Sequence, residues 1–164
     1  MTSQESFPLM ARNILAPSDL SQGVTSEVLP RAVSLSREFD AHLYVLYVYQ
    51  LPSFLDLLTS PHALLKDREE LAGEMEQLAQ QQLSALLSQF AHENIQLHGL
   101  LQLGIPFEEI LKAAQELPAD LIIMCTRGRR GLAHLLGSTT ERVVRMAACP
   151  VVTVKPSRFR FAIP

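Results

Sequence analysis

The sequence predicts an α/β protein with a doubly wound parallel sheet, because strand-like and helix-like segments alternate along the chain. Right-handed crossovers would place helices on both faces of that sheet. Hydrophobic residues make up 48% and charged residues 19% of the 164 residues, which excludes intrinsic disorder and provides material for a core. We expect one domain over residues 1–155 and a short tail over residues 156–164.

The first elements follow from apolar runs and proline positions. Residues 14–17 form a short apolar strand that stops at a Ser-Asp turn. Apolar residues at helical spacing follow over residues 24–39, but Pro30 lies among them. We therefore expect either irregular first turns or a helix that begins near Leu29. Residues 42–49 are rich in β-branched and aromatic residues and predict the second strand.

The second half of the chain continues the alternation. A long helix opens at Pro61 and has an apolar stripe of Leu71, Met75, Leu78, Leu86 and Phe90. Residues 95–103 predict a strand, and Pro106 with two acids in the first turn predicts a helix to residue 117. The continuous apolar run 121–125 is typical of a strand buried on both faces. Residues 138–141 fit a capping box for a helix ending near residue 148, and a last strand reaches Val154.

Charge is distributed unevenly and limits the classes of partner. Residues 1–126 carry 6 Lys and Arg against 16 Asp and Glu, whereas residues 127–164 carry 8 Lys and Arg against one acidic residue. Either an anion meets the basic end, or the arginines neutralise the acidic body. The acidic remainder argues against nucleic-acid binding. No apolar run approaches the roughly 20 residues of a membrane span, and residues 1–10 do not resemble a secretory signal, so we expect a cytoplasmic protein.

Polar residues follow two strands of the predicted sheet. Ligands of open parallel sheets bind beyond the carboxyl ends of the strands, where the strand order reverses. Pro17, Ser18 and Asp19 end the first strand, and a glycine-rich segment with Arg127, Arg129 and Arg130 follows the fourth. Free amides at the next helix, near Ser138 and Thr139, would bind phosphate oxygens, and Asp19 would bond ribose hydroxyls or base nitrogens. Alternatively, Gly137 is only a turn glycine and Ser138 only a helix cap.

Other chemistries have weaker support in the sequence. Cys125 ends a strand near Arg127, which would stabilise a thiolate for a redox role; the alternative is a small residue that fills a buried position. Cys149 precedes Pro150 and is expected to be structural. The histidines show no metal-ligand spacing, so no metal site is expected. No Ser-His-Asp arrangement is indicated, and we predict no enzyme activity beyond weak ATP hydrolysis.

Two stretches of the sequence resemble the C-terminal signature of the universal stress protein family. They are Ile122 to Val144, which includes Gly128 and Ser138, and Cys149 to Val152. Residues 14–21 resemble that family's first strand and acidic turn, and residues 104–124 its third helix and fourth strand. The resemblance covers about residues 11–155. It implies a five-stranded sheet in the order 3-2-1-4-5 and a homodimer that pairs its last strands, here Val151 to Val154. Pairing would also cover an apolar edge strand.

The resemblance also implies a site for ATP or a related adenine nucleotide, with or without Mg²⁺. Many members bind ATP through a G-x2-G-x9-G-[ST] loop, and its second and third glycines fall here at Gly128 and Gly137, followed by Ser138. The implied base and ribose contacts fall at Asp19 and Val48, and the residue before the motif is Met124.

Two departures from the family pattern leave two functions open. Cys125 replaces the first glycine of the motif, and only eight residues separate Gly128 from Gly137. Both changes fall on the phosphate side of the implied site. The first hypothesis is a homodimeric, nucleotide-binding stress-response protein that signals to an unknown protein partner. The alternative is a dimeric interaction module whose phosphate loop has lost its nucleotide.

Overall fold

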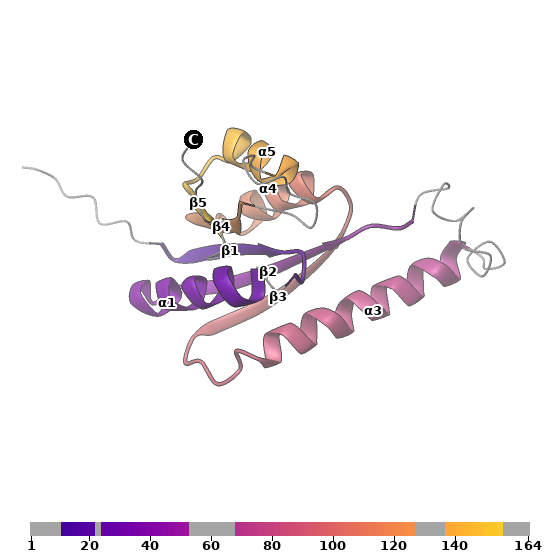
Figure 1. Ribbon diagram of the computed structural model, residues 1–164, viewed down its shortest axis with the longest axis horizontal. Coiled ribbons are helices and arrows are strands. Elements are labelled where there is room, and N and C mark those ends of the chain that lie inside the picture. Colours follow the sequence, from indigo (N-terminus) through magenta and orange to yellow (C-terminus); the bar gives the residue numbers. More distant parts are fainter. Residues whose placement is uncertain (1–10, 22–23, 53–67, 127–136, 156–164) are drawn as a thin grey trace, which may run out of the picture.

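Five parallel strands form the centre of the molecule. The computed structural model describes residues 11–21, 24–52, 68–126 and 137–155. The sheet has the order β3-β2-β1-β4-β5 (Figure 1). Its strands are β1 (Asn13–Ser18), β2 (His42–Tyr49), β3 (Gln96–Leu103), β4 (Leu121–Cys125) and β5 (Val151–Val154). The predicted fold class and strand order are confirmed.

Helices cover both faces of the sheet, as predicted. Helices α1 (Leu29–Phe39) and α3 (Arg68–Ser88) lie on one face, and α4 (Pro106–Glu116) and α5 (Ser138–Met146) on the other (Figure 1). Each face has its own apolar cluster, one with Val33 and Leu83 and one with Ile110 and Val143. Alternate residues of β4 enter the two clusters, since Ile123 joins the first and Ile122 the second. A central parallel strand therefore has to be apolar on both sides.

Pro30 explains the irregular start of the helix after β1. The π-helix η1 (Val24–Val28) precedes α1, and Pro30 lies in the first turn of α1. Proline has no N–H and its ring crowds the carbonyl four residues earlier, here that of Ser26. The preceding turn widens instead of continuing as an α-helix. Both expectations from the sequence are thus confirmed: the first turn is irregular, and the α-helix begins at Leu29.

The apolar stripe predicted on α3 is partly wrong. Leu78 is 53% exposed, whereas the buried positions of α3 are Ala79, Leu83 and Leu86. These three positions follow a spacing of four and three residues, and Leu83 and Leu86 belong to the apolar cluster on this face of the sheet. The predicted start of this helix at Pro61 lies outside the described residues.

The capping box predicted at residues 138–141 is not formed. The N-cap of α5 is Gly137, Ser138 is already the first helical residue, and no side chain caps this end. The reason is that the Gly137 carbonyl accepts the first helical hydrogen bond, from the Glu141 amide at 2.9 Å. The Glu141 carboxylate instead pairs with Arg145 one turn later, at 2.6 Å.

Candidate functional site

The sheet opens between β1 and β4 at their carboxyl ends. These strands pair only through Ile14 with Leu121 and Leu15 with Ile122, whereas β1 stays paired with β2 as far as Ser18. The Asn13 carbonyl accepts from the Asp120 amide, so the odd-numbered residues of β1 direct their backbone groups toward β4. Pro17 is one of these and has no N–H to donate. Because this donor is missing, the hydrogen bonds between β1 and β4 end here. A crevice is left at the point where the strand order reverses.

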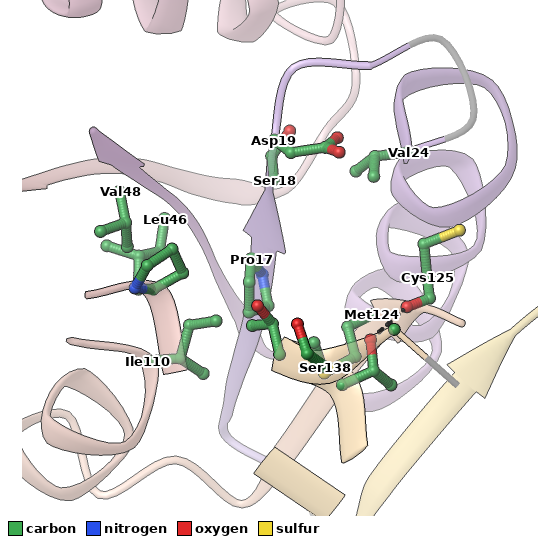
Figure 2. Close-up of a pocket in the computed structure, with 14 residues that line it drawn as sticks. Pro17, Ser18, Asp19, Val24, Leu46, Val48, Ile110, Met124, Cys125 and Ser138 are labelled. Carbon is green, nitrogen blue, oxygen red and sulfur yellow. Dashed lines mark hydrogen bonds between the residues drawn. The ribbon is translucent and has the colours of Figure 1, made fainter. Parts of the chain in front are cut away.

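A pocket of about 280 Å³ occupies this crevice. That volume lies near the lower end of small-molecule sites, about 300–1,000 Å³. The β strands contribute part of the wall, and the starts of η1, α4 and α5 contribute the rest. The described residues that line it are Pro17, Ser18, Asp19, Val24, Leu46, Val48, Pro106, Ile110, Met124, Cys125, Gly137, Ser138, Thr139 and Thr140 (Figure 2).

Two side chains fold the turn after β1 back on its own backbone. The Ser18 hydroxyl accepts a hydrogen bond from the Leu20 amide, and the Asp19 carboxylate accepts one from the Ser21 amide, both at 3.0 Å. Leu20 adopts a φ of 60°, which such local bonds help to hold. The turn therefore keeps the half-buried Asp19 carboxylate at the rim of the pocket, on the side of Val24 (Figure 2).

The head of α5 brings backbone N–H groups to the opposite side of the pocket. The Gly137 amide donates to the Thr126 carbonyl at 2.8 Å, and the buried Thr140 hydroxyl donates to the Cys125 carbonyl at 2.9 Å. These bonds fix the start of α5 against the end of β4. The amides of Ser138, Thr139 and Thr140 precede the first helical hydrogen bond and so have no partner within the helix. An anion placed there would meet N–H donors and the positive end of the helix dipole.

Cys125 contributes a wall to the pocket. Its side chain is 6% exposed and belongs to the same apolar cluster as Val24 and Val28. Figure 2 shows its sulfur directed away from Ser138. This arrangement agrees with the small buried filler considered from the sequence. The other cysteine, Cys149, packs against the apolar cluster that contains Ile110 and Val143. Burial raises the pKa of its thiol.

Nine of the eleven predicted site residues line this one pocket. They are Pro17, Ser18, Asp19, Val48, Met124, Cys125, Gly137, Ser138 and Thr139. Arg127 and Gly128 lie outside the described residues.

Sequence reasoning missed five wall residues: Val24, Leu46, Pro106, Ile110 and Thr140. Leu46 shares a face of β2 with Val48, so period-two alternation could have found it. Pro106 and Ile110 carry no such signal, because their place depends on how α4 crosses the sheet.

Two further observations concern the described part of the chain. It contains no group of three or more His, Cys, Asp or Glu residues placed to hold a metal ion. Among its helices, none combines the length and apolar character that a membrane crossing requires.

An open parallel sheet with a crevice at its switch point defines a doubly wound α/β protein, and in proteins of this class ligands bind in that crevice. A model of the universal stress protein family matches residues 10–155. The chain belongs to that family.

Relatives and solved structures agree with this assignment. Universal stress protein MJ0531 of Methanocaldococcus jannaschii is 34% identical over 146 residues, which cover 88% of this chain and 82% of the relative. The structure of MJ0577 from the same organism superposes with a TM-score of 0.68 at 25% identity, covering 89% of this chain and 96% of that one. A universal stress protein from Archaeoglobus fulgidus, solved in complex with dAMP, has a TM-score of 0.61 at 22% identity. The match covers 89% of this chain and 99% of that one.

Proposed function

We propose that the pocket binds an adenine nucleotide, ATP or a close relative, and that the protein acts as a nucleotide-dependent stress-response regulator without fast catalysis. The observation that carries the proposal is the placement of the α5 amides opposite Asp19 across an apolar cavity. Amides at a helix start suit phosphates, a carboxylate suits ribose hydroxyls, and walls such as Val48 and Ile110 suit a base. The dAMP complex of the Archaeoglobus fulgidus protein supports this choice of ligand.

Binding is tested by isothermal titration calorimetry of ATP into the full chain, with and without Mg²⁺. ADP and AMP titrations then rank the contribution of each phosphate, and dAMP against AMP tests the ribose 2′-hydroxyl. We expect saturable heat for at least ATP and a matching rise in thermal midpoint, because a ligand that binds only the folded state stabilises it. An absence of both heat and thermal shift at millimolar nucleotide would contradict the proposal.

A matched pair of variants assigns the binding to the pocket. Val48→Trp places a large side chain in the cavity, whereas Leu78→Trp adds the same side chain at a 53% exposed position on α3. We expect Val48→Trp to abolish measurable ATP binding and Leu78→Trp to bind like wild type. Loss in both variants, or in neither, would assign the heat to another part of the molecule.

The nucleotide-free interaction module is distinguished by Cys125→Gly. If the thiol side chain is the lesion that removed nucleotide binding, affinity emerges only in this variant. Because the Cys125 side chain belongs to the apolar cluster that contains Val24 and points away from Ser138 (Figure 2), we expect wild type and Cys125→Gly to bind within about tenfold of each other.

We further propose that the chain acts as a cytoplasmic homodimer joined through β5. Val152 is 41% exposed on this edge strand. An apolar strand edge needs a cover, and a second copy would provide one by symmetric pairing. A protein partner would then read the loaded or empty state of the pocket.

A further inference from the structure

Two histidines on neighbouring strands are joined through their rings at the end of the sheet opposite the pocket. β2 begins at His42, and the register of β2 and β3 pairs His98 with Tyr44. Nδ1 of His42 and Nε2 of His98 are 2.9 Å apart. The ring centroids are 5.2 Å apart and the ring planes differ by 22°, so each nitrogen points at the other almost within the plane of its ring. This contact has the geometry of a nearly linear hydrogen bond.

The number of protons on the two rings decides whether this bond can exist. A neutral imidazole has one N–H and one lone pair, whereas a protonated imidazole has two N–H groups and no lone pair. With both rings neutral, or with one ring protonated, one of the facing nitrogens donates and the other accepts. The singly charged pair has the stronger bond, because its donor is charged. With both rings protonated, both facing nitrogens are donors, so the bond is lost and two positive charges meet.

The surroundings of the pair oppose a second positive charge. Burial first, and the neighbouring His42 second, lower the pKa of His98. The Tyr44 ring stacks on His98 with ring centroids 4.7 Å apart, and a tyrosine carries no negative charge at neutral pH. The causes of the His98 shift include none of the charged side chains on the adjoining elements at this end of the sheet. Those side chains are Arg12, Asp40, Glu93, Lys112, Glu116 and Asp120.

The bond joins the start of an edge strand to its neighbour. β3 lies at the edge of the sheet and pairs with β2. The Gly104 amide donates to the Tyr49 carbonyl, so the even-numbered residues of β3, including His98, direct their backbone groups toward β2. We propose that His42 and His98 form an acid-sensitive link between β2 and β3. The link holds while at least one ring is neutral, and it breaks when both rings are protonated. The start of β3 then opens locally, without unfolding of the sheet.

Proton NMR of the imidazole rings tests the link in the wild-type full chain, from about pH 8 to about pH 4, across the ordinary titration range of histidine. Two coupled groups titrate in two steps that belong to the pair. We therefore expect the His42 and His98 resonances to move together in two steps, the second of them below the ordinary histidine value of 6.5. The exposed His92 is the control and should move in one step. A single independent step for each of His42 and His98 would overturn the proposal.

His42→Gln separates the shared bond from the burial of His98. Glutamine does not titrate, so one of the two causes of the lowered pKa of His98 is removed. We expect this pKa to rise toward its ordinary value and the His98 titration to become a single step. His92→Gln is the matched control and should leave both steps of the pair unchanged. An unchanged two-step titration of His98 in His42→Gln would overturn the proposal.

Hydrogen exchange, corrected for the intrinsic effect of pH on exchange rates, tests the opening of β3. In the wild type, protection of residues 96–100 should fall by about tenfold at the second step, as expected for the loss of one hydrogen bond. Residues 121–125 of the central strand β4 should keep their protection. His42→Gln should show no such step. Protection of residues 96–100 that is constant through the second step, or that falls equally in His42→Gln, would overturn the proposal.

Discussion

Asp120 joins the amino-terminal ends of β1 and β4. One carboxylate oxygen accepts the amides of Arg12 at 2.8 Å and Asn13 at 3.0 Å. The Asn13 side chain adds a further bond across this junction, to the Leu117 carbonyl at 3.0 Å. A single acid thus terminates the central strand pair at the end of the sheet opposite the pocket.

We predict that Asp120→Ala lowers the free energy of unfolding by about 1–2 kcal/mol, because two amides lose a charged acceptor. Asp120→Asn retains an oxygen acceptor and should lose less. Glu116→Ala, at an exposed position of α4, is the control and should leave stability unchanged. Urea unfolding measures all three, and equal midpoints for Asp120→Ala and wild type would contradict this account.

His98 makes stability depend on pH. Burial and His42 lower the pKa of His98 below its ordinary value of 6.5, so the unfolded chain takes up this proton at a higher pH than the folded chain. The contribution of His98 is therefore fully present above about pH 6.5 and is lost as pH falls through the lowered pKa. Urea unfolding across this window should show a smaller loss of stability in His98→Gln than in wild type or His92→Gln. Identical slopes in all three proteins would refute the assignment.

At the scale of elements, one buried hydrogen bond ties α5 to β4. Thr140 is 3% exposed, and its hydroxyl donates to the Cys125 carbonyl at 2.9 Å. Thr140→Val keeps the shape but leaves that carbonyl without its donor. We predict a loss of about 1–3 kcal/mol in the free energy of unfolding. Thr140→Ser keeps the hydroxyl and tests whether the bond, not the methyl group, is responsible.

The same substitution tests how the pocket is assembled. If the bond from Thr140 positions the head of α5, Thr140→Val should also weaken nucleotide binding, and Thr140→Ser should weaken it less. Calorimetry on the folded fraction separates this effect from stability. Unchanged affinity in a destabilised Thr140→Val would show that α5 is positioned by other contacts.

The elements most readily predicted were those whose signal is local. The apolar run of β4 and the Pro106 start of α4 were both located from neighbouring residues alone. The predicted head of α5 is wrong by one residue, because the choice between Gly137 and Ser138 as N-cap depends on Thr126, eleven residues before Gly137 in the chain. The exposure of Leu78 likewise depends on where α3 crosses the sheet.

The site was predictable to the extent that it follows the strand ends. Pro17 to Asp19 and Gly137 to Thr139 follow β1 and β4, and the topology of a parallel sheet brings these ends together. The walls formed by Ile110 and Leu46 and the meeting of His42 with His98 depend on packing and register instead. The two histidines are 56 residues apart, so no spacing motif could have indicated the pair.

At the scale of the whole molecule, the position of β5 at the edge of the sheet determines the proposed assembly. Carbonyls of Pro150 and Val154 accept amides from Ile122 and Thr126, so the even-numbered residues of this segment face β4. Thr153 therefore directs its backbone N–H away from β4, to the side on which the proposed second copy would pair. Thr153→Pro removes this donor and should convert a dimer to a monomer in light scattering, while Thr153→Ser remains dimeric. A monomeric wild type, or a Thr153→Pro dimer, would contradict pairing through β5.

The pocket between β1 and β4 is the feature on which the proposed function depends. A crystal structure of the full chain grown with ATP and Mg²⁺ tests it most directly. We predict nucleotide density in this pocket, with phosphate oxygens within hydrogen-bond distance of the Ser138 to Thr140 amides and the ribose facing Asp19. A crevice that excludes the nucleotide because protein atoms fill it would contradict the account.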